Sequence, residues 1–120
     1  MLDFYCDQII SKKTNVEIVF ETDLVMAFHH TDPYFEKHVV IIPKEHIESL
    51  STYPNTTALN NDLFAAIKFV TTMLEEEHGG CRVSSNIGSY QTTKHLHWYA
   101  HCGKRLRTED GTIIAMNEQR

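Results

Sequence analysis

The feature that most constrains this chain is a short stretch in which polar rings alternate with apolar side chains, His95-Leu-His-Trp-Tyr-Ala-His101. Side chains of a β-strand alternate between its two faces, so the three histidines and the tyrosine would share one face. The leucine, tryptophan and alanine between them would share the other face and pack on the core. We therefore predict a strand over 93–102 whose polar face looks outward or into a pocket. The alternative is an exposed face that is merely rich in histidine.

The spacing of these rings suits chemistry on an anion or a metal ion. Same-face neighbours two residues apart in a strand lie ~6.5–7 Å from each other. Two imidazoles at that distance can act on one phosphate, or approach one metal ion. The preceding segment, Asn86-Ile-Gly-Ser-Tyr-Gln-Thr92, is polar and turn-rich. Such a loop can direct backbone N–H groups toward an anion, which favours a phosphate site at the start of the strand.

Further strands are predicted from alternation and from β-branched runs, over residues 15–21, 24–30, 38–42 and 81–87. The run over 38–42 is continuously apolar after its histidine, so we expect it to be buried on both faces. Apolar residues at 4-4-3-4 spacing, from Leu59 to Leu74, predict a long helix that begins after Pro54 and stops at Gly79-Gly80.

Shorter elements are a helix over 44–50 after Pro43, a turn at 109–111 and a last strand over 112–116. The order of strands, helix and strands favours an α+β fold in which hairpin-linked strands form a meander and the helices lie on one face.

Composition excludes several classes of protein. A length of 120 residues predicts one domain. The net charge of −5 argues against a nucleic-acid-binding surface, and the longest strongly apolar run, 39–42, is too short to cross a membrane. The first ten residues lack the features of a signal peptide. Three cysteines at wide spacing predict no disulfide framework, so we expect a cytoplasmic protein.

Three segments together resemble the histidine-triad (HIT) superfamily of nucleotide hydrolases and transferases. Residues 91–98, Q-T-T-K-H-L-H-W, resemble the family signature, and Glu21–Phe28 and His38–His46 resemble two further motifs in the correct order. The resemblance covers about residues 4–105. It implies a single HIT-like domain over 1–120, with a five-stranded antiparallel meander sheet, one long and one short helix, and a homodimer.

The resemblance also implies a mechanism. His97 would attack the α-phosphorus of a nucleotide derivative to form a covalent nucleotidyl-histidine, and water or another acceptor would resolve it. His95 would orient His97, and Tyr99 or His101 would stand where the family has its third histidine. The implied nucleotide-binding residues are Phe28, His30, Asn86, Gln91 and Thr92. No cofactor is required for this catalysis.

The chain departs from the family pattern at three places. Tyr99 replaces the third histidine, and a phenol is a poor proton shuttle near neutrality. His30 stands where the family has a ribose-binding aspartate, and the loop between Asn86 and Gln91 is shorter than the common form. These departures favour an alternative, a nucleotide-binding protein with little or no turnover. A third hypothesis is a metal-dependent hydrolase with His95, His97 and His101 as ligands.

A structural zinc site is also implied. Some relatives bind zinc through an N-terminal C-x-x-C and two histidines. One histidine follows the lysine of the motif that matches residues 38–46, and the other is the first histidine of the family signature. The matching positions here are Asp3, Cys6, His46 and His95, and aspartate is an acceptable zinc ligand. The alternative is that Cys6 is simply a small buried apolar residue.

Overall fold

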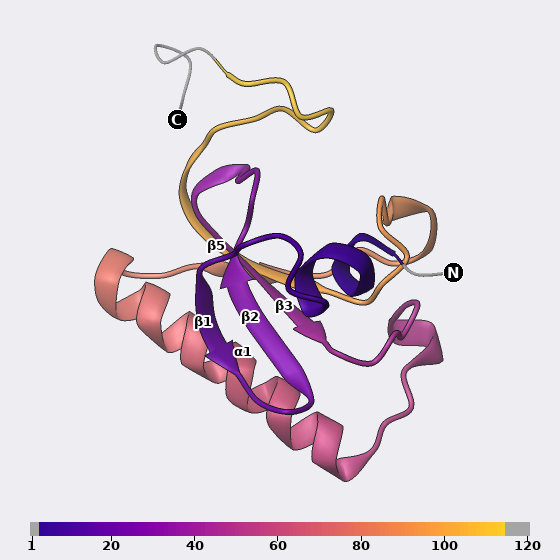
Figure 1. Cartoon of the computed structure of the whole chain (residues 1–120). Coiled ribbons are helices and arrows are strands. Elements are labelled where there is room, and N and C mark those ends of the chain that lie inside the picture. The colour runs from indigo at the N-terminus through magenta and orange to yellow at the C-terminus, as the bar shows by residue number, and fades with distance from the viewer. Residues whose placement is uncertain (1–2, 115–120) are drawn as a thin grey trace.

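The computed structural model describes residues 3–114, and its centre is a five-stranded antiparallel sheet (Figure 1). The strands are β1 (Ile18–Glu21), β2 (Val25–His29), β3 (Phe35–Pro43), β4 (Arg82–Ser84) and β5 (Trp98–Arg105). Their order across the sheet is β1-β2-β3-β5-β4. The predicted antiparallel α+β fold is confirmed. The meander holds for the first three strands, after which the chain crosses to the far edge as β4 and returns as β5 beside β3.

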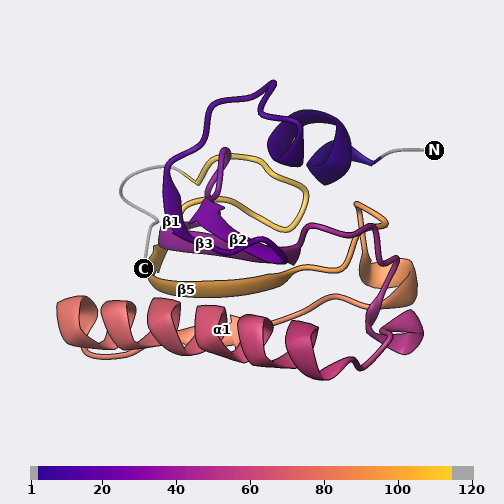
Figure 2. The ribbon, with the colours of Figure 1, turned by 60° about the horizontal axis from the view of Figure 1, so that its bottom comes forward.

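The sheet is covered on both faces, as the edge-on view in Figure 2 shows. The long helix α1 (Thr57–His78) lies on one face, and the short helical segment η1 (Tyr5–Ile10) lies on the other with the chain that follows β5. The predicted stripe packs α1 onto the sheet, with Leu59, Leu63, Val70 and Leu74 buried. The helix stops at Gly79, whose φ of 88° is accessible to glycine at little cost.

The two faces of the sheet carry separate apolar clusters, and these confirm the partition expected from the alternating stretch. Leu96, Trp98 and Ala100 belong to the cluster beneath α1. Tyr99 packs instead against the cluster beneath η1, which is formed by Tyr5, Ile9, Met26, Phe28, Val40 and Ile42. Because β3 separates these two clusters, residues 38–42 are buried on both faces, as predicted.

Two predictions about local structure are wrong. Residues 44–50 form no helix, and only Leu50–Thr52 (η2) make a single 3₁₀ turn. The strand predicted from residue 93 begins only at Trp98, opposite Ile41 of β3. Residues 91–97 do not pair with any strand among the described residues. Instead they run alongside the irregular segment after β3. The N–H of Leu96 donates a hydrogen bond to the carbonyl of Ile47 in that segment over 2.7 Å.

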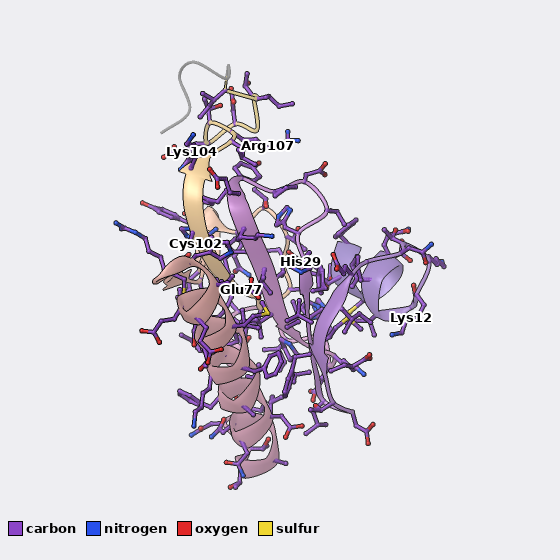
Figure 3. All side chains as sticks on the ribbon, turned by 90° about the vertical axis from the view of Figure 1, so that its left-hand side faces the viewer. Lys12, His29, Glu77, Cys102, Lys104 and Arg107 are labelled. Carbon is purple, nitrogen blue, oxygen red and sulfur yellow. The ribbon has the colours of Figure 1, made fainter. Side chains whose placement is uncertain are left out.

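The ends of the chain add two more differences. No element was predicted for the first ten residues, yet η1 buries Tyr5 and Ile9 against the sheet. After β5 the predicted turn forms at 109–111, but the expected last strand is reduced to one bridge, Arg107 to Ile113, within the described residues. Residues 115 and 116 of that prediction lie outside them. In Figure 3, Arg107 marks this segment and Glu77 the end of α1. No helix within 3–114 is long and apolar enough to cross a membrane.

Candidate active site

The imidazole of His97 is buried and held in one tautomer. Its Nδ1 lies 2.7 Å from the backbone carbonyl of His95, and because a carbonyl only accepts, Nδ1 carries the proton. Nε2 has no hydrogen-bond partner among the described residues, so it keeps its lone pair. Burial lowers the pKa of His97, which keeps the ring neutral near pH 7. The structure thus presents a neutral imidazole with a free Nε2, as a nucleophile requires.

The loop that precedes His97 is fixed by the side chain of Gln91. Its Nε2 donates to the carbonyl of Glu48 over 2.8 Å, and its Oε1 accepts the N–H of Gly88 over 3.1 Å. The hydroxyl of Ser85 donates to the carbonyl of His97 over 2.6 Å. Gln91 was predicted to hold phosphate, but here its amide is engaged with the backbone. Its contribution in this structure is therefore to set the path of the loop.

A cleft of ≈ 600 Å³ lies between η1, β5 and the chain after β2. His97 is 1% exposed and does not line this cleft, but Tyr5 and Tyr99, whose rings contact His97, do. Five of the predicted site residues line it, namely His30, Asn86, Thr92, Tyr99 and His101. Phe28, predicted to bind nucleotide, instead lies in the core with only 1% of its surface exposed. A second hollow of ≈ 730 Å³ lies over β4 and β5, away from His97. We place the candidate active site in the first cleft, because the ring of Tyr99 joins it to His97 at 4.9 Å.

Rings form one wall of this cleft, and His38 at its centre was not predicted as a site residue. The imidazole of His30 stacks on that of His38 with 4.4 Å between centroids, and the ring of Tyr99 meets His38 edge-on at 4.7 Å. Burial lowers the pKa of His38 to about 3 and also lowers the pKa of His30. The signal in the sequence was a histidine at the start of a strand predicted to be buried on both faces. A polar side chain is rarely buried there without a hydrogen-bond partner.

The two candidates for the third histidine differ in position. Tyr99 adjoins His97 directly, and burial raises the pKa of its phenol. His101 lies farther along β5, stacked on Phe35 with 3.9 Å between centroids. Of the two candidates, Tyr99 is therefore the one whose ring contacts that of His97.

The four predicted metal ligands converge. One ligand atom from each of Asp3, Cys6, His46 and His95 lies within 4.8 Å of the others. The sulfur of Cys6 is 3.5 Å from Nδ1 of His95 and 3.8 Å from Nδ1 of His46. A sulfur at ~2.3 Å and a nitrogen at ~2.0 Å from one tetrahedral zinc ion lie roughly 3.5 Å apart. The two separations from the sulfur therefore fit a tetrahedral ion, while the oxygen of Asp3 lies closer to the two imidazoles than such an ion requires.

The tautomer of His95 also fits a metal ligand. Its Nε2 lies 2.8 Å from the carbonyl of Pro43 and must donate to it, so in the neutral ring Nδ1 bears a lone pair. That Nδ1 faces the carboxylate of Asp3 at 2.9 Å. A second interaction that orients a ligating imidazole is common at metal sites. His97 and His101 do not join His95 in any potential metal cluster of residues 3–114, so the three-histidine metal centre is a wrong prediction.

Comparison with known proteins agrees with this geometry. The family model described as HIT domain matches residues 11–105. A 13.2 kDa HIT-like protein of Azospirillum brasilense is 32% identical over 92 residues, 73% of this chain and 75% of that one. The adenylylsulfatase HINT1 of Arabidopsis thaliana is 26% identical over 88% of this chain and 74% of its own.

A solved structure shows the same fold. The HIT family hydrolase from Clostridium thermocellum superposes with a TM-score of 0.70 at 29% identity, over 84% of this chain and 90% of that one. Residues 11–105, which the family model matches, contain every strand of the sheet, helix α1 and the buried His97. The chain belongs to the HIT family.

Proposed function

We propose that the protein is a HIT-type nucleotide hydrolase or nucleotidyl transferase in which Nε2 of His97 is the nucleophile. One observation carries this proposal. Nδ1 of a buried, neutral His97 is committed to the His95 carbonyl, and Nε2 has no partner among the described residues. The cleft lined by Tyr5 and Tyr99, whose rings contact His97, is large enough for part of a nucleotide.

The reaction has two steps. Nε2 of His97 forms a bond to the α-phosphorus while the bond from phosphorus to the leaving group breaks, and the leaving group departs with that electron pair. The proton stays on Nδ1 and keeps its hydrogen bond to the carbonyl of His95, which stabilises the positive charge that develops on the ring. Water or another acceptor then attacks the same phosphorus and loses its proton. His97 is released as the neutral ring.

The test is detection of the covalent nucleotidyl-histidine. The chain would be mixed with adenosine 5′-phosphoramidate, a dinucleoside polyphosphate or adenylyl sulfate, the last because the Arabidopsis relative is named an adenylylsulfatase. Quenching in denaturant at alkaline pH, where the acid-labile phosphorus–nitrogen bond survives, followed by intact-mass measurement should show one adenylyl adduct per chain. His97→Ala should form none, while His78→Ala, an exposed change at the end of α1, should react normally. Nucleotide binding without any adduct or product would favour the binding-only alternative.

A structural role for a metal is a second proposal, favoured by the convergence of Asp3, Cys6, His46 and His95. A zinc ion bound there would cross-link η1 to the segments around His46 and His95, and it would take no part in catalysis. The rings of Tyr5 in η1 and His97 lie 5.3 Å apart, so this cross-link would steady the wall behind the nucleophile. We also propose a cytoplasmic location, since Cys6, Cys81 and Cys102 are all free thiols.

A further inference from the structure

The hydrogen bonds of His30 and His38 define which atoms these rings offer to a ligand. Nδ1 of His30 accepts the backbone N–H of Asp32 over 2.9 Å, and Nδ1 of His38 accepts that of Tyr34 over 2.9 Å. A backbone N–H only donates, so each Nδ1 must hold its lone pair. The proton of each neutral ring is therefore on Nε2. Two stacked imidazoles in the wall of the cleft thus carry N–H donors and no free acceptor.

The donor of His38 lacks a partner. His38 is 5% exposed, and its Nε2 is the buried side-chain polar atom without a hydrogen bond among residues 3–114. Buried polar groups are nearly always paired, so an orphaned donor at the wall of a cleft points to an acceptor supplied by a ligand. The atom is covered by neighbouring rings, so a bound oxygen requires one side chain of the wall to move.

The charged side chains that line the cleft are one cation, Arg105, and two carboxylates, Asp32 and Glu109. Arg105 lines the cleft and makes no ion pair within the described part of the chain, where its Nε donates to the carbonyl of Arg107. Its guanidinium lies 5.3 Å from the centre of the Phe35 ring. Asp32 and Glu109 also line the cleft, but both are exposed and remain hydrated.

We infer that the wall formed by His30 and His38 binds a phosphate group of the substrate other than the phosphate that His97 attacks. A phosphate has only acceptor oxygens for N–H donors, and its charge strengthens each bond. This inference rests on the proposed function, and it narrows the substrate class to nucleotides with two separate phosphate groups. The second group has two sources, a 3′-phosphate on the ribose or the next phosphate of the chain.

Calorimetric titration separates these sources. The wild-type chain would be titrated with AMP, adenosine 3′,5′-bisphosphate and α,β-methylene-ADP, none of which His97 can turn over readily. We expect one of the two bisphosphorylated ligands to bind about 10-fold or more tightly than AMP, as an added charge-assisted hydrogen bond allows. His30→Asp should abolish that preference, because a carboxylate repels phosphate. His38→Asn keeps an acceptor for Tyr34 but loses the Nε2 donor, so it should weaken the preference as well.

His29→Asp is the matched control. His29 precedes His30 on the same strand, but it does not line the cleft and instead lies 3.9 Å from Glu17. The control should retain the full preference for the bisphosphorylated ligand. Equal binding of AMP and both bisphosphates by the wild type, or a preference that survives His30→Asp, would overturn the inference and leave the proposed function standing. Failure of every nucleotide to bind, together with no adduct on His97, would overturn both.

Discussion

The carboxylate of Asp3 lies 2.9 Å from Nδ1 of His95, although 92 residues separate the two in sequence. The same carboxylate oxygen lies 2.5 Å from Nδ1 of His46. Because Nε2 of His95 is committed to the Pro43 carbonyl, the neutral ring turns a lone pair toward an acceptor oxygen. Such a contact is stable only if a positive charge, a proton or a metal ion, lies between the two atoms.

We predict that the ion is zinc. Protein prepared without chelator should carry about one zinc per chain by elemental analysis, and Cys6→Ala should lose it. An ion that binds only the folded chain adds ~4 kcal/mol to the free energy of unfolding at 1,000 times its dissociation constant, so chelation should lower the melting temperature clearly. Cys81→Ala, at a free thiol outside the cluster, should keep both metal and stability. Metal-free protein from a chelator-free preparation would contradict this prediction.

The fold was largely predictable because local patterns carried it, whereas no local pattern predicts the metal cluster. The alternation around Leu96 and Ala100 and the stripe along α1 each correspond to one buried face, whatever the detailed path of the backbone. The convergence of Asp3 with His95 was expected from the family resemblance alone. Nothing in the periodicity of the sequence brings residue 3 near residue 95, since their contact depends on how η1 docks.

The local structure around the site was less predictable, because long-range hydrogen bonds replace local ones there. Leu96 bonds to the carbonyl of Ile47 rather than to a strand, so β5 begins later than the alternation indicates. The side-chain amide of Gln91 likewise donates a long-range hydrogen bond, to the backbone carbonyl of Glu48. His38 was not predicted as a site residue, because a single polar residue at the end of a strand belongs to no repeating pattern. It became a candidate only through its ring contacts with His30 and Tyr99.

Acid should destabilise the protein through His38. Its pKa is about 3 in the folded chain and about 6.5 when unfolded, so it is neutral in both states above pH 6.5. As the pH falls from 6.5 toward 3, only the unfolded chain binds a proton at this site. The free energy of unfolding should therefore decrease by up to ~1.4 kcal/mol per pH unit from this group.

Urea denaturation at pH 7.5, 6 and 5 measures that slope. His38→Asn removes the titrating ring, so its stability should depend less steeply on pH than that of the wild type over this window, whatever its stability at pH 7.5. His78→Asn, at the exposed end of α1, should retain the wild-type slope. A slope that is unchanged in His38→Asn would show that the buried imidazole is not the source of the acid sensitivity.

The open edge of the sheet at β4 predicts a homodimer. Both edge strands are short, but β1 is broken by an irregularity between Ile18 and Phe20, whereas β4 is regular and all three of its residues are exposed. Unprotected edges tend to pair. Sedimentation should give about twice 13.9 kDa, and Val83→Lys should weaken the dimer about 10-fold or more. Ile18→Lys, the matched change on β1, should not. A monomer mass that is independent of concentration would refute the prediction.

Tyr99 should make turnover depend on the leaving group. Its ring adjoins that of His97 at 4.9 Å, and burial raises the pKa of its phenol, so it is a weaker acid than the histidine of the family pattern. An amine leaving group needs a proton, whereas a nitrophenolate departs as a stable anion. General acid catalysis is typically worth ~10²–10⁴-fold. Tyr99→His should therefore accelerate hydrolysis of adenosine 5′-phosphoramidate by up to that factor and change hydrolysis of a nitrophenyl adenylate little.

The comparison of the two substrates is what assigns the role, since a change in folding or in nucleotide binding would alter both rates together. His97→Ala should abolish both reactions, which ties the effect to the covalent step. Equal acceleration of both substrates by Tyr99→His, or of neither, would mean that Tyr99 does not protonate the leaving group. His101 would then be the candidate, because it lies on the same face of β5 and lines the same cleft. In that case His101→Ala should slow the phosphoramidate selectively.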